Sequence, residues 1–134
     1  MFKNIKRFKY SYIIYYIKKM KEIKDVSALR VGEYETVCYY KEKGYSIYRF
    51  IIHGKKSKET VEKGTPDFFV VKGNEKFYVE EKTDNMGFSI EQDEVIDDLI
   101  ERGNKVILAR YNSRRKMLVL CEIVKRKIID RVFV

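Results

Sequence analysis

Two consecutive strand-like segments joined by a short turn constrain the fold of this chain more than any other feature. Residues 68–71 are all apolar, which is typical of a strand covered on both faces. Residues 72–75 contain Gly-Asn and read as a turn, and residues 76–82 then read as a second strand. Strands joined by so short a turn must pair antiparallel. The sequence therefore predicts a β-hairpin over residues 68–82.

A helix is predicted soon after this hairpin. Ser89 followed by Gln92 has the form of a capping box at a helix N-terminus. Behind it, one apolar stripe at helical spacing comprises Val95, Ile96, Leu99 and Ile100. Gly103 ends the helix, and residues 105–110 read as the next strand. A strand-helix-strand connection of this length predicts a parallel strand pair with a right-handed crossover.

The rest of the chain completes an α/β pattern. Residues 28–43 read as a helix that stops at Gly44, and residues 45–52 read as a strand. Residues 53–64 are polar, basic and flanked by glycine, which indicates a loop, and residues 117–124 form a last apolar run. The order αβββαβ, with a further strand or helix, describes a mixed β-sheet flanked by α-helices.

The length of 134 residues suits a single domain. Residues 25–134 are predicted to form that domain, and residues 1–24 a basic amphipathic N-terminal arm. The arm is predicted to be helical. The sequence leaves open whether this helix lies against the domain, DNA or a membrane surface, and we favour packing combined with a phosphate contact.

The formal net charge of +9 and the isoelectric point near 9.4 predict a polyanionic partner. Nucleic acid is the leading candidate, because lysine and arginine bind phosphates by releasing condensed counterions. The positive charge is concentrated in the opening segment, whereas residues 75–101 are rich in acids. The alternative interpretation of the opening segment is a solvated basic tail.

Neither cysteine pattern nor hydropathy indicates secretion or membrane insertion. Cys38 and Cys121 lie in apolar surroundings without a second ligand at zinc spacing, so we expect buried, reduced thiols. The apolar segment 10–17 is shorter than the roughly 20 residues that span a bilayer. Lysines follow it where a signal peptide would carry small residues at its cleavage site. We expect an intracellular, cytoplasmic protein, and a virus or mobile element is a compatible source.

Three ionisable residues of the hairpin are predicted to converge. Alternate side chains of a strand share a face, so Glu80 and Lys82 are neighbours. The hairpin turn places Asp67, at the start of the first strand, beside Glu80. Two close carboxylates are costly to ionise without a cation, and hard oxygen ligands suit Mg²⁺, for which Mn²⁺ can substitute. A lysine beside such a metal can orient a water molecule or take its proton, which is the equipment for phosphodiester hydrolysis.

Over residues 29–110 the sequence resembles the PD-(D/E)XK nuclease superfamily, and within it the VRR-NUC nucleases and the archaeal Holliday-junction resolvases. In the VRR-NUC pattern a Gly-x-Pro-Asp precedes Glu-x-Lys and a helix that carries a glutamine. Gly64-Thr-Pro-Asp67, Glu80-Glu-Lys82 and Gln92 match this pattern in order. In the resolvases a glutamate on the first helix precedes a Gly-aromatic pair, and Glu33 stands in this way before Gly44-Tyr45.

This resemblance implies a restriction-endonuclease-like fold and a Mg²⁺-dependent deoxyribonuclease, an endonuclease that could select DNA structures such as Holliday junctions. Asp67 and Glu80 would be metal ligands, Lys82 would lie beside the attacking water, and Glu33 would be an additional ligand. Gln92 would belong to the same site. We expect DNA and a homodimer as partners, with no membrane and no small-molecule cofactor. The alternative is a catalytically inactive nucleic-acid-binding module of the same fold.

Several site residues have a second interpretation. Glu33 shares a helical face with apolar residues, and Glu35 is the fallback for its role. Gln92 could complete the helix cap with Ser89 instead of serving the site. The candidates for nucleic-acid contacts around the polar loop are His53, Lys55, Lys56, Lys58 and Lys63. His53 could also be a general acid or a plain surface residue, and a lysine-rich loop is often only solvated.

Overall fold

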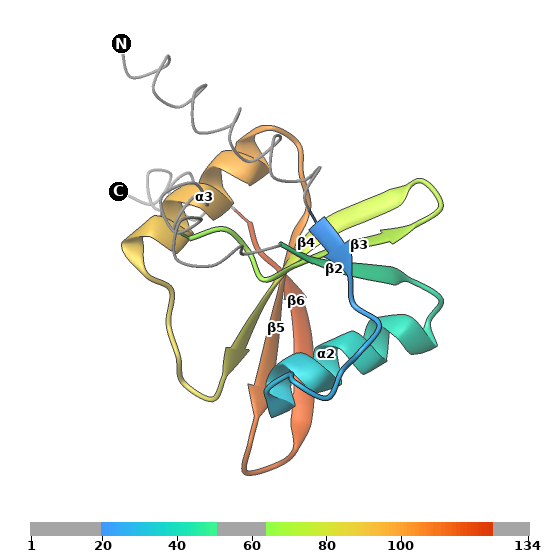
Figure 1. Ribbon diagram of the computed structural model, residues 1–134. Coiled ribbons are helices and arrows are strands. Elements are labelled where there is room, and N and C mark those ends of the chain that lie inside the picture. Colours follow the sequence, from blue (N-terminus) through green and yellow to red (C-terminus); the bar gives the residue numbers. More distant parts are fainter. Residues whose placement is uncertain (1–19, 51–63, 125–134) are drawn as a thin grey trace, which may run out of the picture.

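A computed structural model describes residues 20–50 and 64–124 of the chain (Figure 1). Neither of the two helices that it describes is long and apolar enough to cross a membrane. The elements are β1 (Met20–Glu22), α2 (Val31–Glu42), β2 (Ser46–Phe50), β3 (Phe68–Lys72), β4 (Glu75–Thr83), α3 (Ile90–Glu101), β5 (Val106–Asn112) and β6 (Met117–Glu122).

The six strands form one mixed sheet in the order β1-β2-β3-β4-β5-β6. The pair β4–β5 is parallel and is connected through α3, whereas every other neighbouring pair is antiparallel. The predicted hairpin is confirmed as β3–β4, and the predicted parallel pair as β4–β5. The chain is thus a mixed α/β protein, as its sequence predicts.

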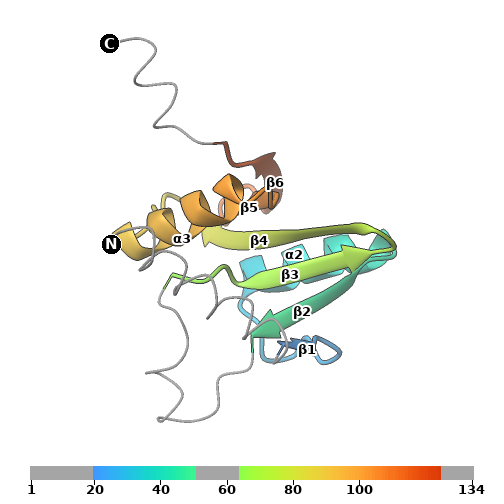
Figure 2. The ribbon, with the colours of Figure 1, turned by 90° about the horizontal axis from the view of Figure 1, so that it is seen from above.

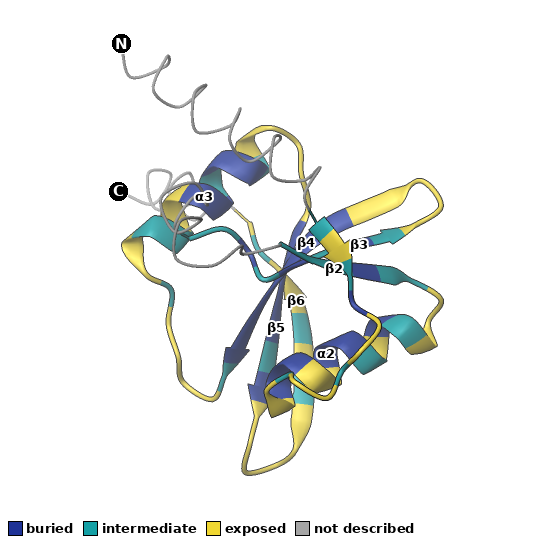
Figure 3. Ribbon diagram, viewed as in Figure 1, coloured by how far each residue is buried: buried dark blue, intermediate teal, exposed yellow. Residues whose placement is uncertain are grey.

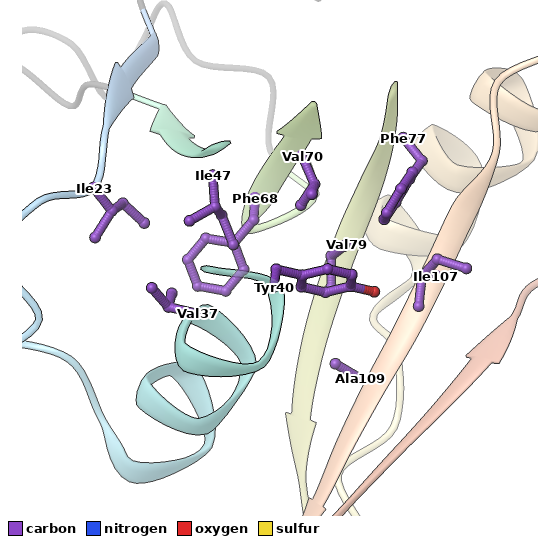
Figure 4. Close-up of a cluster of buried hydrophobic side chains, with 10 residues drawn as sticks. All are labelled: Ile23, Val37, Tyr40, Ile47, Phe68, Val70, Phe77, Val79, Ile107 and Ala109. Atoms are coloured by element: carbon purple, nitrogen blue, oxygen red, sulfur yellow. The ribbon is translucent and has the colours of Figure 1, made fainter. Parts of the chain in front are cut away.

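The two helices cover opposite faces of the sheet (Figures 1 and 2). Phe77 and Val79 of β4 point toward α2, while Tyr78 between them points toward α3. The core on the α2 side is drawn in Figure 4 and consists of Ile23, Val37, Tyr40, Ile47, Phe68, Val70, Phe77, Val79, Ile107 and Ala109. Burial of apolar side chains on both faces of the central strands holds the three layers together.

The α3 side of the sheet has its own, smaller core. Val95, Ile96 and Leu99 of α3 pack against Tyr78 and Val106, which confirms the apolar stripe expected for this helix. The outward faces of both helices are exposed, as Figure 3 shows by colour. Helix α3 is therefore held by one apolar stripe, whereas the buried face of α2 combines Val37 and Tyr40 with the polar residues Glu33 and Thr36.

The end of the predicted N-terminal helix is a strand instead. Met20–Glu22 forms β1 and pairs antiparallel with Phe50, Arg49 and Tyr48 of β2. Backbone hydrogen bonds to the edge of β2 stabilise this strand more than a few apolar residues at helical spacing would stabilise a helix. Residues 1–19 of the predicted arm lie outside the described residues.

The C-terminal apolar run also departs from one expectation. Of the two alternatives, strand or helix, the run forms the strand β6, which pairs with β5 at the edge of the described sheet. Cys121 lies on this edge strand and is exposed, and Cys38 lies in α2 and is half-buried. The prediction that both thiols are buried is therefore wrong, whereas both cysteines are free as expected.

Helix α2 starts in direct contact with the end of β4. A side chain at Gly32 would collide with the Glu81 carboxylate and lie 2.8 Å from the Thr83 hydroxyl oxygen. Glycine thus allows the helix N-terminus to approach the strand closely.

We predict that Gly32→Ala destabilises the protein by about 1–3 kcal/mol, because overpacking exceeds the usual gain of alanine in a helix. The matched control is Gly87→Ala, where an added Cβ meets no atom within 4 Å. Thermal unfolding measures both. An unchanged or raised midpoint for Gly32→Ala would show that the contact is loose.

Candidate active site

The candidate site lies where strands β3 and β4 separate. Phe68 pairs with Val79, so Asp67 and Glu80 stand at the next position of the register. There the side chains take over the hydrogen bonding: the Asp67 N–H donates to Glu80 Oε1 at 3.1 Å, and the Glu81 N–H donates to Asp67 Oδ2 at 2.9 Å. Buried Pro66, which has no N–H, precedes this point. β4 continues to Thr83 paired with β5, so the two carboxylates meet at a fork in the sheet.

The glycine of the Gly-Thr-Pro-Asp sequence also has a steric role. Gly64 has φ +97°, a left-handed conformation that favours glycine. A Cβ at this position would lie 2.5 Å from the carbonyl of Glu91 and 2.7 Å from the amide nitrogen of Gln92. The segment that delivers Asp67 therefore packs directly against the first turn of α3.

Lys82 and Gln92 complete the cluster on the α3 side. The Lys82 Nζ donates to Gln92 Oε1 at 2.8 Å and lies 3.5 Å from Glu80 Oε2. Gln92 Nε2 donates to Glu80 Oε2 at 2.7 Å. The Lys82 side chain is only 8% exposed and lies over the ring of Phe88. The ammonium group is thus held at one position instead of extending into solvent.

Gln92 fills both roles that the sequence left open. Its backbone N–H donates to Ser89 Oγ, and its Oε1 accepts from the Ser89 N–H at 2.9 Å, which completes the capping box of α3. The same amide bonds Lys82 and Glu80. The cap of α3 and the candidate site therefore share one side chain, and the helix N-terminus fixes the position of the site.

Burial and mutual repulsion perturb the carboxylates. Burial, followed by the negative charge of Asp67, raises the pKa of Glu80 to about 8, although Lys82 acts in the opposite direction. Burial likewise raises the pKa of Asp67, against the hydrogen bond from the Glu81 N–H. At neutral pH the pair therefore retains a proton unless a cation replaces it.

Glu33 is buried, as its place on the apolar face of α2 predicts, whereas Glu35 is exposed. Its Oε2 accepts from Arg49 at 2.6 Å and from Arg30 at 3.3 Å, and its Oε1 accepts from the Arg30 N–H. Burial opposes ionisation, but the Arg30 hydrogen bonds and the two positive charges outweigh it and lower the pKa of Glu33. Glu33 is thus an ionised carboxylate with two arginine partners.

Glu33 lies near the fork without joining a compact cluster. Its charge contributes to the raised pKa of Asp67, so the two carboxylates interact electrostatically. In the described ranges, however, no group of three or more His, Cys, Asp or Glu side chains is arranged to hold a metal ion. The structure brings together Asp67, Glu80, Lys82 and Gln92.

The sequence interpretation missed three charged neighbours of the site. Glu81 points to the opposite face from Glu80, where it is buried over Gly32 and accepts from the Thr83 hydroxyl at 2.8 Å. Strand alternation could have revealed this buried acid, because Glu81 continues the α2-facing series of Phe77 and Val79. No sequence pattern indicates that Arg30 and Arg49 would meet Glu33.

The other predicted contacts fall elsewhere in the chain. His53, Lys55, Lys56, Lys58 and Lys63 all lie outside the described residues. Comparisons of the whole chain with protein-family models and with curated proteins found no match.

We predict that Asp67→Asn stabilises the protein at alkaline pH. In the wild type, the raised pKa of Glu80 means that the folded state binds more protons than the unfolded state. This contribution to stability is fully present below the unfolded pKa, near 4.5, and is lost as the pH rises through about 8. An amide at position 67 removes the negative charge that repels the Glu80 carboxylate. The variant should therefore lose less stability than the wild type as the pH rises.

The measurement is thermal unfolding in EDTA from pH 5 to 9. The difference between Asp67→Asn and the wild type should grow with pH and level off above pH 8, whereas Glu35→Gln, at an exposed carboxylate, should follow the wild type. Parallel curves for Asp67→Asn and the wild type would show that the two carboxylates are not coupled.

Proposed function

We propose that this protein is a metal-dependent nuclease that hydrolyses DNA phosphodiester bonds. The observation that carries the proposal is the fork of β3 and β4, where the carboxylates of Asp67 and Glu80 adjoin and Lys82 lies on the same face as Glu80. This combination of two hard oxygen donors and one fixed ammonium group suits chemistry on a phosphate.

The donor set fits Mg²⁺ or Mn²⁺. Asp67 and Glu80 offer carboxylate oxygens, and a divalent cation between them would replace the proton that the pair otherwise retains. Glu33 is a proposed additional ligand, direct or through water, although Arg30 and Arg49 engage its oxygens. When bound, the metal would neutralise charge on a phosphate oxygen and lower the pKa of a bound water molecule.

The protein's own residues supply the rest of the chemistry. Gln92 holds the Lys82 ammonium group beside Glu80, from where it can orient the attacking water or take its proton. Gln92 is a positioning residue in this scheme, because it acts through Lys82 and Glu80. Burial of the Glu80 and Lys82 side chains excludes bulk water from them and strengthens their electrostatic effect on a phosphate.

The arrangement of the elements supports a restriction-endonuclease-like fold. From α2 to β5 the order is αβββαβ, with three antiparallel strands followed by a parallel one. Together with the sequence pattern of Asp67, Glu80, Lys82 and Gln92, this order supports membership of the PD-(D/E)XK superfamily. Within it we propose an endonuclease that resembles the Holliday-junction resolvases and VRR-NUC nucleases.

A nucleic-acid-binding module without catalysis is the second candidate. The specific observation in its favour is the pairing of Glu33 with two arginines, which leaves two of the described carboxylates adjoining at the fork. Such a module would keep the basic charge and the fold but would not need a metal.

We predict that the wild type cleaves DNA in Mg²⁺ and that Ca²⁺, with longer and more flexible coordination, supports binding with little hydrolysis. Asp67→Asn should abolish cleavage and leave metal-free DNA binding equal or tighter, because it removes a negative charge. Lys82→Ala should slow cleavage by about 10²- to 10⁴-fold through loss of the group that acts on water. Nicking of labelled plasmid and junction DNA measures the rate, and fluorescence anisotropy measures binding.

Thermal unfolding of each variant excludes misfolding as the cause of lost activity. Full activity of the wild type in EDTA, or wild-type cleavage by a folded Asp67→Asn protein, would overturn the proposed metal site. Absence of cleavage by the folded wild type in Mg²⁺ would favour the binding module over the nuclease.

The two glutamates of α2 provide a matched pair. We predict that Glu33→Gln lowers the cleavage rate by about 10- to 100-fold, the usual effect of removing a supporting group at a metal site. The new amide oxygen can still accept from the Arg30 N–H, so the helix start is preserved. Glu35→Gln, on the exposed face, should leave the rate within about twofold of the wild type. Equal effects of the two substitutions would contradict the role of Glu33.

A further inference from the structure

Among the described residues, the candidate site has no excess positive charge with which to attract a polyanion. Four described acidic side chains lie at or around the fork, and three described basic side chains form ion pairs with members of this group. These groups are Asp67, Glu80, Glu81 and Glu33 on one side and Lys82, Arg30 and Arg49 on the other. A phosphodiester adds a further negative charge. Attraction to nucleic acid must therefore come from flanking groups.

The turn between β5 and β6 carries such groups. Arg114, Arg115 and Lys116 are exposed and form the only run of three basic residues within the two described ranges. None of the three side chains has an ion-pair partner among the described residues. Three adjacent, exposed cations that pair with no described acid are suited to phosphate groups.

The turn is fixed to the strand that carries the site. Ser113 donates to Asp84 twice, from its N–H to Oδ1 and from its hydroxyl to Oδ2, each at 2.7 Å. The Asp84 N–H donates to the Tyr111 carbonyl, and Arg110 donates to the carbonyls of Asp84 and Met86. Asp84 directly follows β4. The position of the turn is therefore coupled to the position of Lys82.

The backbone of this region is held in an uncommon conformation. Asp84 and Lys116 have φ of +55° and +53°, and they are the only non-glycine residues with positive φ in the described part of the chain. Such conformations persist where the surrounding contacts enforce them, and they cluster at functional sites. Here the hydrogen bonds of Asp84 to Ser113 and Tyr111 enforce one of them.

The path from the candidate site to the turn is short. Asp84 lies two residues beyond Lys82, and its carboxylate binds Ser113, the residue that precedes Arg114. Only a few residues therefore separate Lys82 from the β5–β6 turn.

We propose that Arg114, Arg115 and Lys116 contact the DNA backbone next to the phosphate that is cleaved. This inference rests on the proposed nuclease function. Contacts of this kind fix the position of the duplex and carry no sequence information. The turn thereby supplies the attraction that the described site lacks, and its attachment through Asp84 keeps the bound backbone in register with Lys82.

The test is a triple variant, Arg114→Gln, Arg115→Gln and Lys116→Gln, with labelled double-stranded DNA in Ca²⁺. Its affinity should fall at least tenfold at about 0.1 M salt, and the log-log salt slope should decrease by about 0.9 for each lost contact. The control removes equal charge beside the β3–β4 turn, at the other end of β4 (Figure 1), through Lys43→Gln, Lys72→Gln and Lys76→Gln. The control should bind within about twofold of the wild type.

Cleavage in Mg²⁺ is measured in parallel for all three proteins. Equal loss of affinity in the two triple variants would show that the loss depends only on net charge, and this result would overturn the inference. Unchanged affinity and slope in the Arg114–Lys116 variant would also overturn it. Cleavage by the wild type would in that case still support the nuclease proposal. If the wild type binds but does not cleave, and only this variant loses binding, the contact stands and the nuclease proposal fails.

Discussion

The fork of the sheet depends on one reciprocal interaction, in which Asp67 and Glu80 replace the backbone ladder of β3 and β4 with hydrogen bonds to their carboxylates. Because of it, β4 leaves β3 and runs on with β5 alone, and its last residues are open to groups from both helices. Gln92 reaches the fork from α3, while Gly32 lets α2 approach from the other face. The separation of β3 and β4 therefore gives both helices access to the candidate site.

The same interaction is a source of instability. Buried Glu80 and half-buried Asp67 lie within reach of each other and oppose ionisation, in agreement with the pKa of about 8 for Glu80. Lys82 and the amide of Gln92 offset part of this cost, but a neutral pair would be more stable at high pH. A chain that retains such a pair sacrifices stability, and this trade-off is typical of binding and catalytic sites.

The elements with strong local signals were predictable. The glycine-containing turn defines the hairpin, and Ser89 with Gln92 and its apolar stripe defines α3. The strand at Met20–Glu22 was not predictable from helical spacing, because it exists only through pairing with β2. Likewise the exposure of Cys121 depends on β6 being at an edge of the described sheet, which its apolar neighbours in the sequence do not reveal.

By itself, the sequence determined that Asp67, Glu80 and Lys82 converge, because a tight turn and the alternation of side chains fix their relation over a short stretch of chain. Only the tertiary structure decided that Arg49 and Arg30 neutralise Glu33, that Glu81 is buried over Gly32, and that Gln92 serves the helix cap and the site at once. These contacts join different elements. Their geometry depends on where each helix rests on the sheet, and packing of the whole core sets that position.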